Sequence, residues 1–258
     1  MKVCYPKHAI PFADLGVLAL KAYPAVMRAT WRWLVLFGIV NYANAWFLTG
    51  WPPEWLATVF GFLALIINMC LASAILLGIH WAFAGQPHTF RAVTQELLPR
   101  LWRVIMVVFI YIAVAMLGYI WARWLSGEVG HWNLSFGLQA MLLLCLAGLP
   151  LLMFWLVTLF VVPLVVLYRR PIGLAFHESM WRVHRGRLFR TFLIYAWFAA
   201  GYYAVSGDTL HMQHLTDWHV GWVLQLAMLF AWFPFGLTLV TLVLHGEGEE
   251  DHPELQMG

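Results

Sequence analysis

Residues 168–190, YRRPIGLAFHESMWRVHRGRLFR, form a basic segment between two of the most apolar stretches of the chain. The segment holds six of the fifteen lysine and arginine residues. The whole chain of 258 residues is 63% hydrophobic and only 10% charged, whereas soluble domains carry about 25% charged residues. This composition predicts an integral membrane protein, in which the basic segment lies outside the hydrocarbon layer.

The apolar segments predict an all-α, polytopic membrane protein with six transmembrane helices, because a helix needs roughly 20 mostly apolar residues to cross a bilayer. The six segments are 33–49, 56–81, 104–122, 136–168, 189–206 and 220–245. We expect the fourth to be one long helix, kinked near Pro150 and Pro163, because each proline removes a backbone donor. Residues 1–245 then form a single transmembrane domain, and residues 246–258 form an acidic, flexible tail.

The basic residues predict the orientation of the chain. Fourteen of the fifteen fall on one side of the expected membrane, and only Arg123 falls on the other. By the positive-inside rule the basic side is cytoplasmic, which places both termini in the cytoplasm. The fourteen residues are Lys2, Lys7, Lys21, Arg28, Arg32, Arg91, Arg100, Arg103, Arg169, Arg170, Arg182, Arg185, Arg187 and Arg190.

Similar sequences precede the first, third and fifth apolar segments: RATWRWL (28–34), RLWRVI (100–105) and RLFRTF (187–192). Each has two arginines around an aromatic residue, and each follows an amphipathic stretch that contains proline. The repetition predicts three membrane hairpins, each preceded by a cytoplasmic interfacial helix.

The third interfacial helix is expected over residues 171–187. Four apolar residues share one of its faces, which we expect to lie against the acyl boundary: Ile172, Phe176, Met180 and Val183. The arginines then lie at the level of the lipid phosphates. We expect a site for anionic lipid or an acidic partner protein at Arg182, Arg185, Arg187 and Arg190. The alternative is that these arginines only fix the topology.

Residues 161–190, VVPLVVLYRRPIGLAFHESMWRVHRGRLFR, resemble the best-marked segment of a six-helix membrane domain. That domain occurs fused to some bacterial glycerophosphodiester phosphodiesterases, and alone in YciC-like inner-membrane proteins. The residues at comparable positions are Pro163, Ala175, Ser179, Arg185, Gly186 and Arg187. The resemblance implies a six-helix architecture and a bacterial inner membrane. It implies no phosphodiesterase activity, because no such domain is present in this sequence.

Polar residues within the expected spans are few, and none of those near the middle is Asp, Glu, Lys or Arg. This pattern argues against a proton-coupled or ion-coupled transporter. Asn41 and Asn44 share one helical face, and Asn68 in the neighbouring span is placed to meet them. We interpret the three asparagines as interhelical hydrogen-bonding residues. In the alternative of a small-molecule or lipid transporter, they mark the candidate cavity.

Histidines suggest a second alternative, a periplasmic transition-metal site. The sequence DTLHMQHLTDWH (208–219) places His211, His214 and His219 at spacings that suit zinc, copper or nickel. His80 and His245 end the second and sixth segments, where contact with helix-end carbonyls is more typical than haem ligation.

No catalytic motif is present, and no nucleic-acid partner is indicated. We therefore expect a non-enzymatic protein without a required cofactor, which acts as a scaffold or accessory subunit or in the organisation of membrane lipid.

Overall fold

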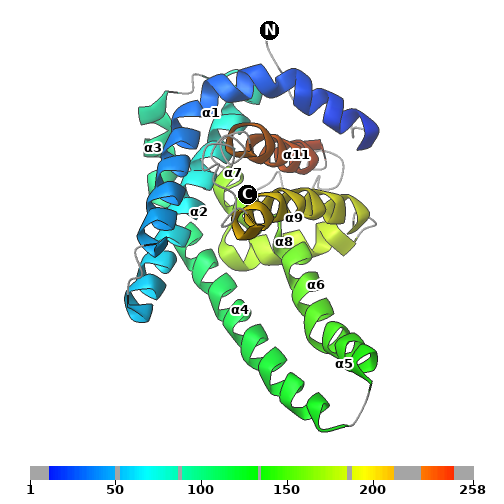
Figure 1. Ribbon diagram of the computed structural model, residues 1–258. Coiled ribbons are helices and arrows are strands. Elements are labelled where there is room, and N and C mark those ends of the chain that lie inside the picture. Colours follow the sequence, from blue (N-terminus) through cyan, green and yellow to red (C-terminus); the bar gives the residue numbers. More distant parts are fainter. Residues whose placement is uncertain are drawn as a thin grey trace.

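The computed structural model describes residues 12–49, 53–86, 89–132, 135–184, 188–211 and 228–246, and all regular structure within these ranges is helical. Figure 1 shows the arrangement. In chain order the α-helices are α1 (Phe12–Thr49), α2 (Glu54–Ala84), α3 (Phe90–Leu97), α4 (Leu101–Gly130), α5 (Phe136–Leu143), α6 (Leu149–Thr158), α7 (Val161–Leu167), α8 (Ile172–His184), α9 (Leu188–His211) and α11 (Phe233–Gly246). Between them lie a 3-10 turn, η1 (Leu98–Arg100), and two π-helical turns, η2 (Leu144–Gly148) and η4 (Met228–Trp232).

Three helical runs among the described residues are long and apolar enough to cross a membrane: Glu54–Ala84, Phe90–Gly130 and Phe136–Leu167. They contain the second and third predicted segments and all but the last residue of the fourth. The fifth and sixth correspond to shorter apolar stretches, Phe189–Ala200 and Leu229–His245. The first predicted segment lies in the second part of α1. The acidic residues of the predicted tail, from 247 on, lie outside the described residues.

The first helix changes direction along its length, as Figure 1 shows, and Pro24 lies inside it. A proline within a helix removes one hydrogen bond and favours a bend. Buried apolar residues follow helical spacing in the first part of α1: Leu15, Ala19, Ala22 and Val26. This part therefore packs through one face, while the second part lies beside α2.

The fourth predicted segment is one helical run, which confirms the prediction of a single long helix. Its regular hydrogen bonding is interrupted at two points, both near the prolines. The π-helical turn η2 ends just before Pro150, which stands in the first turn of α6. A turn at Leu159–Phe160 separates α6 from α7 and comes just before Pro163. Each break therefore lies where a proline interrupts the backbone hydrogen bonding.

Each proline within a helix also removes the α-helical donor of the carbonyl four residues earlier. For the kink in the fourth segment this carbonyl is Leu146 O, which accepts from Trp121 Nε1 of α4 at 3.2 Å. In α11 the proline is Pro234. The corresponding carbonyl, Phe230 O, accepts from Tyr23 Oη of α1. At these two prolines a side chain of a different helix thus bonds to the carbonyl, which satisfies it where a bilayer offers no water.

Two tryptophans join α9 to the last helix. The rings of Trp197 and Trp232 stack with centroids 3.7 Å apart and an interplanar angle of 8°. Each indole N–H donates to the main-chain carbonyl of the other tryptophan, at 3.2 and 2.8 Å. Both polar groups are therefore satisfied without water.

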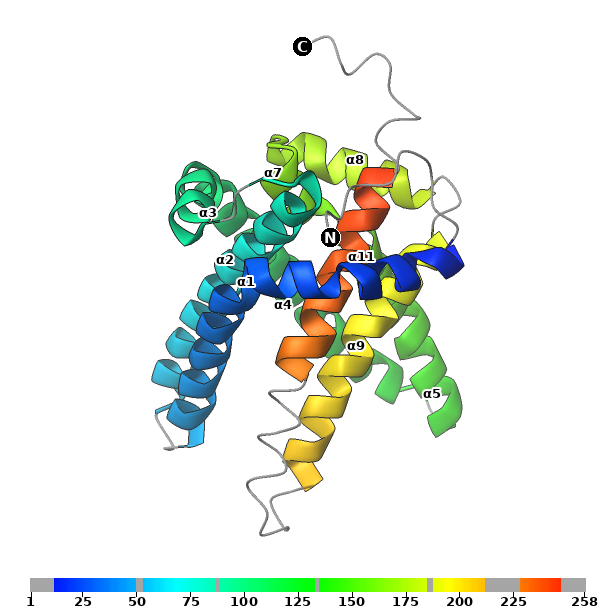
Figure 2. The same cartoon turned by 90° about the horizontal axis from the view of Figure 1, so that it is seen from above.

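The main hydrophobic core lies at one end of the molecule, where α3, α7 and α8 cross the ends of the longer helices (Figure 2). It includes Phe83 of α2, Phe160 at the start of α7 and Leu244 of α11, all nearly inaccessible. In contrast, α4, α5 and α6 extend away from the other helices (Figure 1). Their outer surface exposes large apolar side chains, with Phe136 86% exposed. Such a surface is expected where a helix faces lipid or a membrane partner.

Candidate functional site

The first charged cluster lies where α3 meets the end of α7. Glu96 precedes Arg100 by one helical turn, and its Oε1 accepts from the guanidinium groups of both Arg100 and Arg169. Arg100 is 6% exposed and also donates, through Nη1, to Val166 O in the last turn of α7. Thr89 begins α3 as its N-cap, with its Oγ1 accepting from the amide of Ala92.

The second charged cluster lies where α8 meets the end of α11. Glu178 precedes Arg182 by one turn, and its Oε1 accepts from Arg182 Nη2 at 2.8 Å. Its Oε2 lies 3.2 Å from Arg170 Nε. Arg182 also donates through Nη1 to Leu244 O in the last turn of α11, at 3.3 Å. Glu178 and Arg182 are only 8% and 6% exposed.

The two clusters share one design, and we call them the α3 clamp (Glu96, Arg100) and the α8 clamp (Glu178, Arg182). In each, a glutamate orients an arginine four residues later, and the arginine bonds to a carbonyl at the end of another helix. The last carbonyls of a helix have no intrahelical donor and carry partial negative charge, so a buried guanidinium is favourable there. The α3 clamp therefore fastens the α3 segment to the end of α7, and the α8 clamp fastens α8 to the end of α11.

A turn between α7 and α8 links the two clamps. Its two adjacent arginines contact different glutamates: Arg169 pairs with Glu96, and Arg170 pairs with Glu178. Arg103 of α4 adds a further contact, because its Nη1 donates to Arg169 O at 2.8 Å. The charged side chains thus form one layer that connects α3, α4, α7, α8 and α11.

Arg169 has an unusual backbone conformation, with φ of 56°, and no other non-glycine residue among those described has a positive φ. It follows α7, where the amides of Tyr168 and Arg170 both donate to Leu164 O. Glycine is the usual residue at this left-handed position after a helix, and a larger residue costs about 1–2 kcal/mol. The contacts that Arg169 makes with Glu96 and Arg103 give a reason for the arginine here.

The α3 clamp lies before the apolar part of α4. Its surroundings lower the pKa of both of its residues. The hydrogen bond from Arg169 lowers the pKa of Glu96; burial opposes this effect, and the charge of Arg100 adds to it. Burial lowers the pKa of Arg100, and repulsion from Arg169 and Arg103 acts in the same direction, while Glu96 opposes it. The glutamate is therefore held as a carboxylate among several arginines.

The arginines predicted to bind lipid or a partner do not all lie at the surface of the protein. A helix is present as α8 over most of the range expected for the third interfacial helix. Its buried face differs from the predicted apolar one: Ala175, Glu178, Ser179, Arg182 and Val183 are buried, while Met180 is 51% exposed. Arg182 therefore lies inside the molecule, where it bonds to Glu178 and a main-chain carbonyl rather than standing at the surface.

The other members of the predicted arginine site are spread along the chain. Arg190 is half-buried on α9. Arg185 and Arg187 lie outside the described residues. The sequence pattern placed the apolar face of α8 against the acyl boundary and its arginines at the level of the lipid phosphates. Part of the polar face turns inward instead, because Leu244 O of α11 accepts from Arg182 and Val157 O of α6 accepts from Ser179 Oγ.

The predicted contact between asparagines is present for one pair. Asn41 and Asn68 exchange side-chain hydrogen bonds in both directions, at 3.2 and 3.0 Å, and Asn41 Nδ2 also lies 2.7 Å from Phe37 O. Asn44 is not part of this pair, and its Oδ1 is buried without a hydrogen-bond partner. The reciprocal amides support the interpretation of Asn41 and Asn68 as residues that hold α1 against α2.

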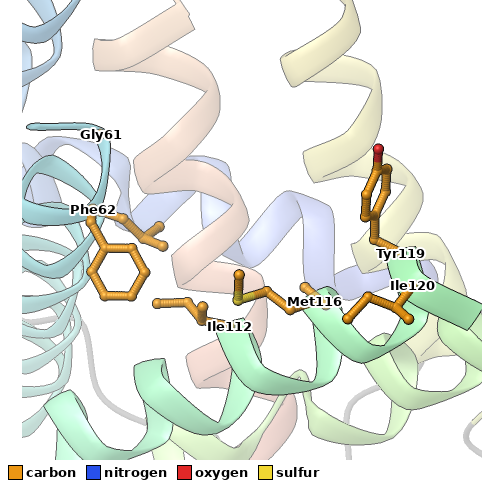
Figure 3. A pocket seen from close by; sticks show the side chains of 8 residues that line it. Gly61, Phe62, Ile112, Met116, Tyr119 and Ile120 are labelled. Atoms are coloured by element: carbon orange, nitrogen blue, oxygen red, sulfur yellow. The ribbon is translucent and has the colours of Figure 1, made fainter. Parts of the chain in front are cut away.

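A groove lies between α2 and α4, with a volume of about 570 Å³. Figure 3 shows Phe62 of α2 facing Ile112 and Met116 of α4. Apart from the hydroxyl of Tyr119, the side chains that line it are apolar, and none of the three asparagines is among them. The candidate cavity therefore does not coincide with this groove, whose chemistry suits hydrocarbon only.

The predicted metal site falls largely outside the described residues. His211 is the last residue of α9, and His214 and His219 lie beyond the part that the structure describes. Within the described ranges, no group of three or more histidine, cysteine, aspartate or glutamate residues is placed to hold a metal ion. His80 and His245 lie near the ends of α2 and α11, which contact each other.

Comparison of the chain with protein-family models, with characterised proteins and with solved structures gives no match. The clamp residues Glu96, Arg100 and Glu178, and the turn residues Arg169 and Arg170, were not singled out as site residues by the sequence patterns. A signal for the clamps is nevertheless present, because QELLPR (95–100) and HESMWR (177–182) share the same glutamate-to-arginine spacing. This spacing brings the two side chains together on a helix.

Proposed function

We propose that this chain is a non-enzymatic bacterial inner-membrane protein that acts as a scaffold or accessory subunit in contact with inner-leaflet lipid. The proposal rests on the contacts that the charged residues make. The two clamps and the arginines around them form connections between helices at one end of the molecule. The middle of each expected span lacks Asp, Glu, Lys and Arg, which leaves no carboxylate or basic side chain there for coupled transport.

The proposed architecture has six transmembrane helices in three hairpins, with both termini in the cytoplasm. The basic residues on one side and the resemblance to the YciC-like membrane domain support this arrangement. Reporter fusions after Pro53, Gly130 and Asp217 should report a periplasmic location, and a fusion after Pro171 a cytoplasmic one. A periplasmic signal at Pro171 would contradict the proposed topology.

The scaffold role is supported by the exposed apolar surface of α4, which includes Met116 and Leu117. The test is purification from native membranes in mild detergent, with partners identified by mass spectrometry and their ratio measured. We expect a stoichiometric partner that is lost when Met116 and Leu117 are both changed to alanine. The same change at Ile39, an exposed residue of α1, serves as the matched control. Recovery of the chain alone, with no partner, would contradict the scaffold role.

A lipid transporter is the second candidate, and the groove between α2 and α4 favours it because its lining suits an acyl chain. It lacks charged groups that would select a headgroup. Lipid transfer between vesicles that depends on the purified chain would favour the transporter over the scaffold. The transition-metal site at His211, His214 and His219 stays a prediction, which elemental analysis of an untagged protein tests.

A further inference from the structure

The charged layer carries more positive than negative charge. Five arginines take part in it (Arg100, Arg103, Arg169, Arg170 and Arg182), against the two carboxylates of the clamps. Three positive charges therefore remain without a carboxylate in this layer. Such an excess needs an external anion or costs free energy through mutual repulsion.

The excess charge is located on the exposed arginines. Arg100 and Arg182 are enclosed and are held by glutamate and main-chain oxygens. In contrast, Arg103 is exposed, and the Arg169 side chain is 68% exposed. A guanidinium has five N–H donors, and the hydrogen bonds described above use only a part of them on Arg103 and Arg169. Donors thus remain for an anion at the surface.

A contact with the main chain holds Arg103 next to the turn that carries Arg169. Arg103 donates to the main-chain carbonyl of Arg169, so the first turn of α4 touches the turn after α7. Arg170 follows directly, and its side chain is 28% exposed. Two apolar residues close to Arg103 in the sequence, Leu98 and Trp102, are also exposed. Tryptophan and arginine together are typical of the boundary between hydrocarbon and headgroups.

We propose that Arg103 and Arg169, with Arg170 beside them, bind the phosphate of an anionic phospholipid headgroup. This inference rests on the proposed membrane orientation, which places the patch at the inner leaflet. Arginine suits the role because its planar fork forms paired hydrogen bonds with phosphate oxygens. The ligand is a lipid because the patch borders the apolar part of α4 and the exposed Trp102.

The test uses the full chain in nanodiscs of phosphatidylcholine, with and without phosphatidylglycerol. Retention of phosphatidylglycerol is measured by native mass spectrometry. Each arginine near an anionic surface contributes about fivefold in affinity. Arg103→Gln leaves every contact of the clamps in place and should reduce affinity about fivefold. Combination with Arg169→Gly, which suits the left-handed backbone, should reduce it about 25-fold. Arg123→Gln, an exposed arginine at the other end of α4, is the matched control and should retain wild-type affinity.

Three results would overturn the proposal. One is wild-type retention of phosphatidylglycerol by the Arg103→Gln variant. Another is wild-type affinity after lysine replaces both Arg103 and Arg169, since charge alone would then suffice. The third is displacement of the lipid by inorganic phosphate at the same concentration as the lipid, which would make free phosphate the ligand. Each of these results leaves the partner measurement of the scaffold role unaffected, so the two proposals fail separately.

Discussion

Replacement of Glu178 by glutamine should destabilise the protein strongly. The substitution keeps the shape of the side chain and removes its charge. Glu178 joins two arginines, and one of them, Arg182, is buried and also donates to the Leu244 carbonyl. Removal of one partner from a buried ion pair leaves an uncompensated charge and costs about 3–5 kcal/mol. We expect a loss of this size in the free energy of unfolding.

Glu96→Gln is the matched comparison, because Glu96 has the same place in the α3 clamp. Its partner Arg100 is buried, but Glu96 itself is 32% exposed and its other partner Arg169 is largely exposed. Water therefore reaches the carboxylate and replaces part of the lost interaction. A partly exposed pair of this kind contributes less, about 1–2 kcal/mol. The two carboxylates should therefore differ severalfold in their effect although they share the same sequence spacing.

The assay is unfolding by sodium dodecyl sulfate in mixed micelles at neutral pH, monitored by tryptophan fluorescence. A second variant distinguishes the cost of the unpaired buried charge from the cost of changed packing. It combines Glu178→Leu with Arg182→Met, so that apolar residues replace the pair. This double substitution should restore most of the stability, because the buried charge is gone as well. The reasoning is refuted if Glu178→Gln costs no more than Glu96→Gln, or if the double variant is as unstable as the single one.

Three further substitutions have defined outcomes. Trp121→Phe removes the indole donor at the first kink of the fourth segment and should cost about 0.6–2 kcal/mol in the same assay. Gly236→Ala should cost about 1–3 kcal/mol, because the new Cβ would stand 2.6 Å from a ring carbon of Phe198; an unchanged unfolding midpoint would contradict this close contact. Arg169→Gly removes the main cause of the lowered pKa of Glu96. The lowered pKa stabilises the folded state above the ordinary value of 4.5, and this contribution is lost as the pH falls through the folded-state pKa. The difference in unfolding free energy between wild type and Arg169→Gly should therefore change below about pH 4.5 and stay constant at neutral pH.

Much of the fold follows from local features of the sequence. Long apolar runs predict helices long enough to cross a membrane, and three such helices are present. The kinks at Pro150 and Pro163 also follow directly, since a missing backbone donor acts wherever the proline stands. The contact between Asn41 and Asn68 was predictable because two amides in adjacent apolar helices have few other partners.

The orientation of α8 was not predictable in the same way. Helical periodicity separates an apolar face from a polar one, but at a membrane boundary either face has a favourable environment. The decision depends on Leu244 O and Arg170, which meet the polar face from elsewhere in the fold. The link from Arg169 to Glu96 likewise joins residues 73 positions apart. Contacts of this kind depend on the packed arrangement of helices, which a local pattern does not contain.

The kinked helices have a consequence for how this protein can evolve. Pro150 interrupts the helical hydrogen bonding of the fourth segment, and the carbonyl that it leaves without a donor, Leu146 O, accepts from Trp121 of α4. Mutation of the proline alone restores a regular helix but moves Leu146 O away from the indole, whose N–H then lacks an acceptor in hydrocarbon. Loss of the tryptophan alone leaves the bend without its donor. Homologous sequences should therefore keep both residues or lose both, so the two positions are inherited as a pair.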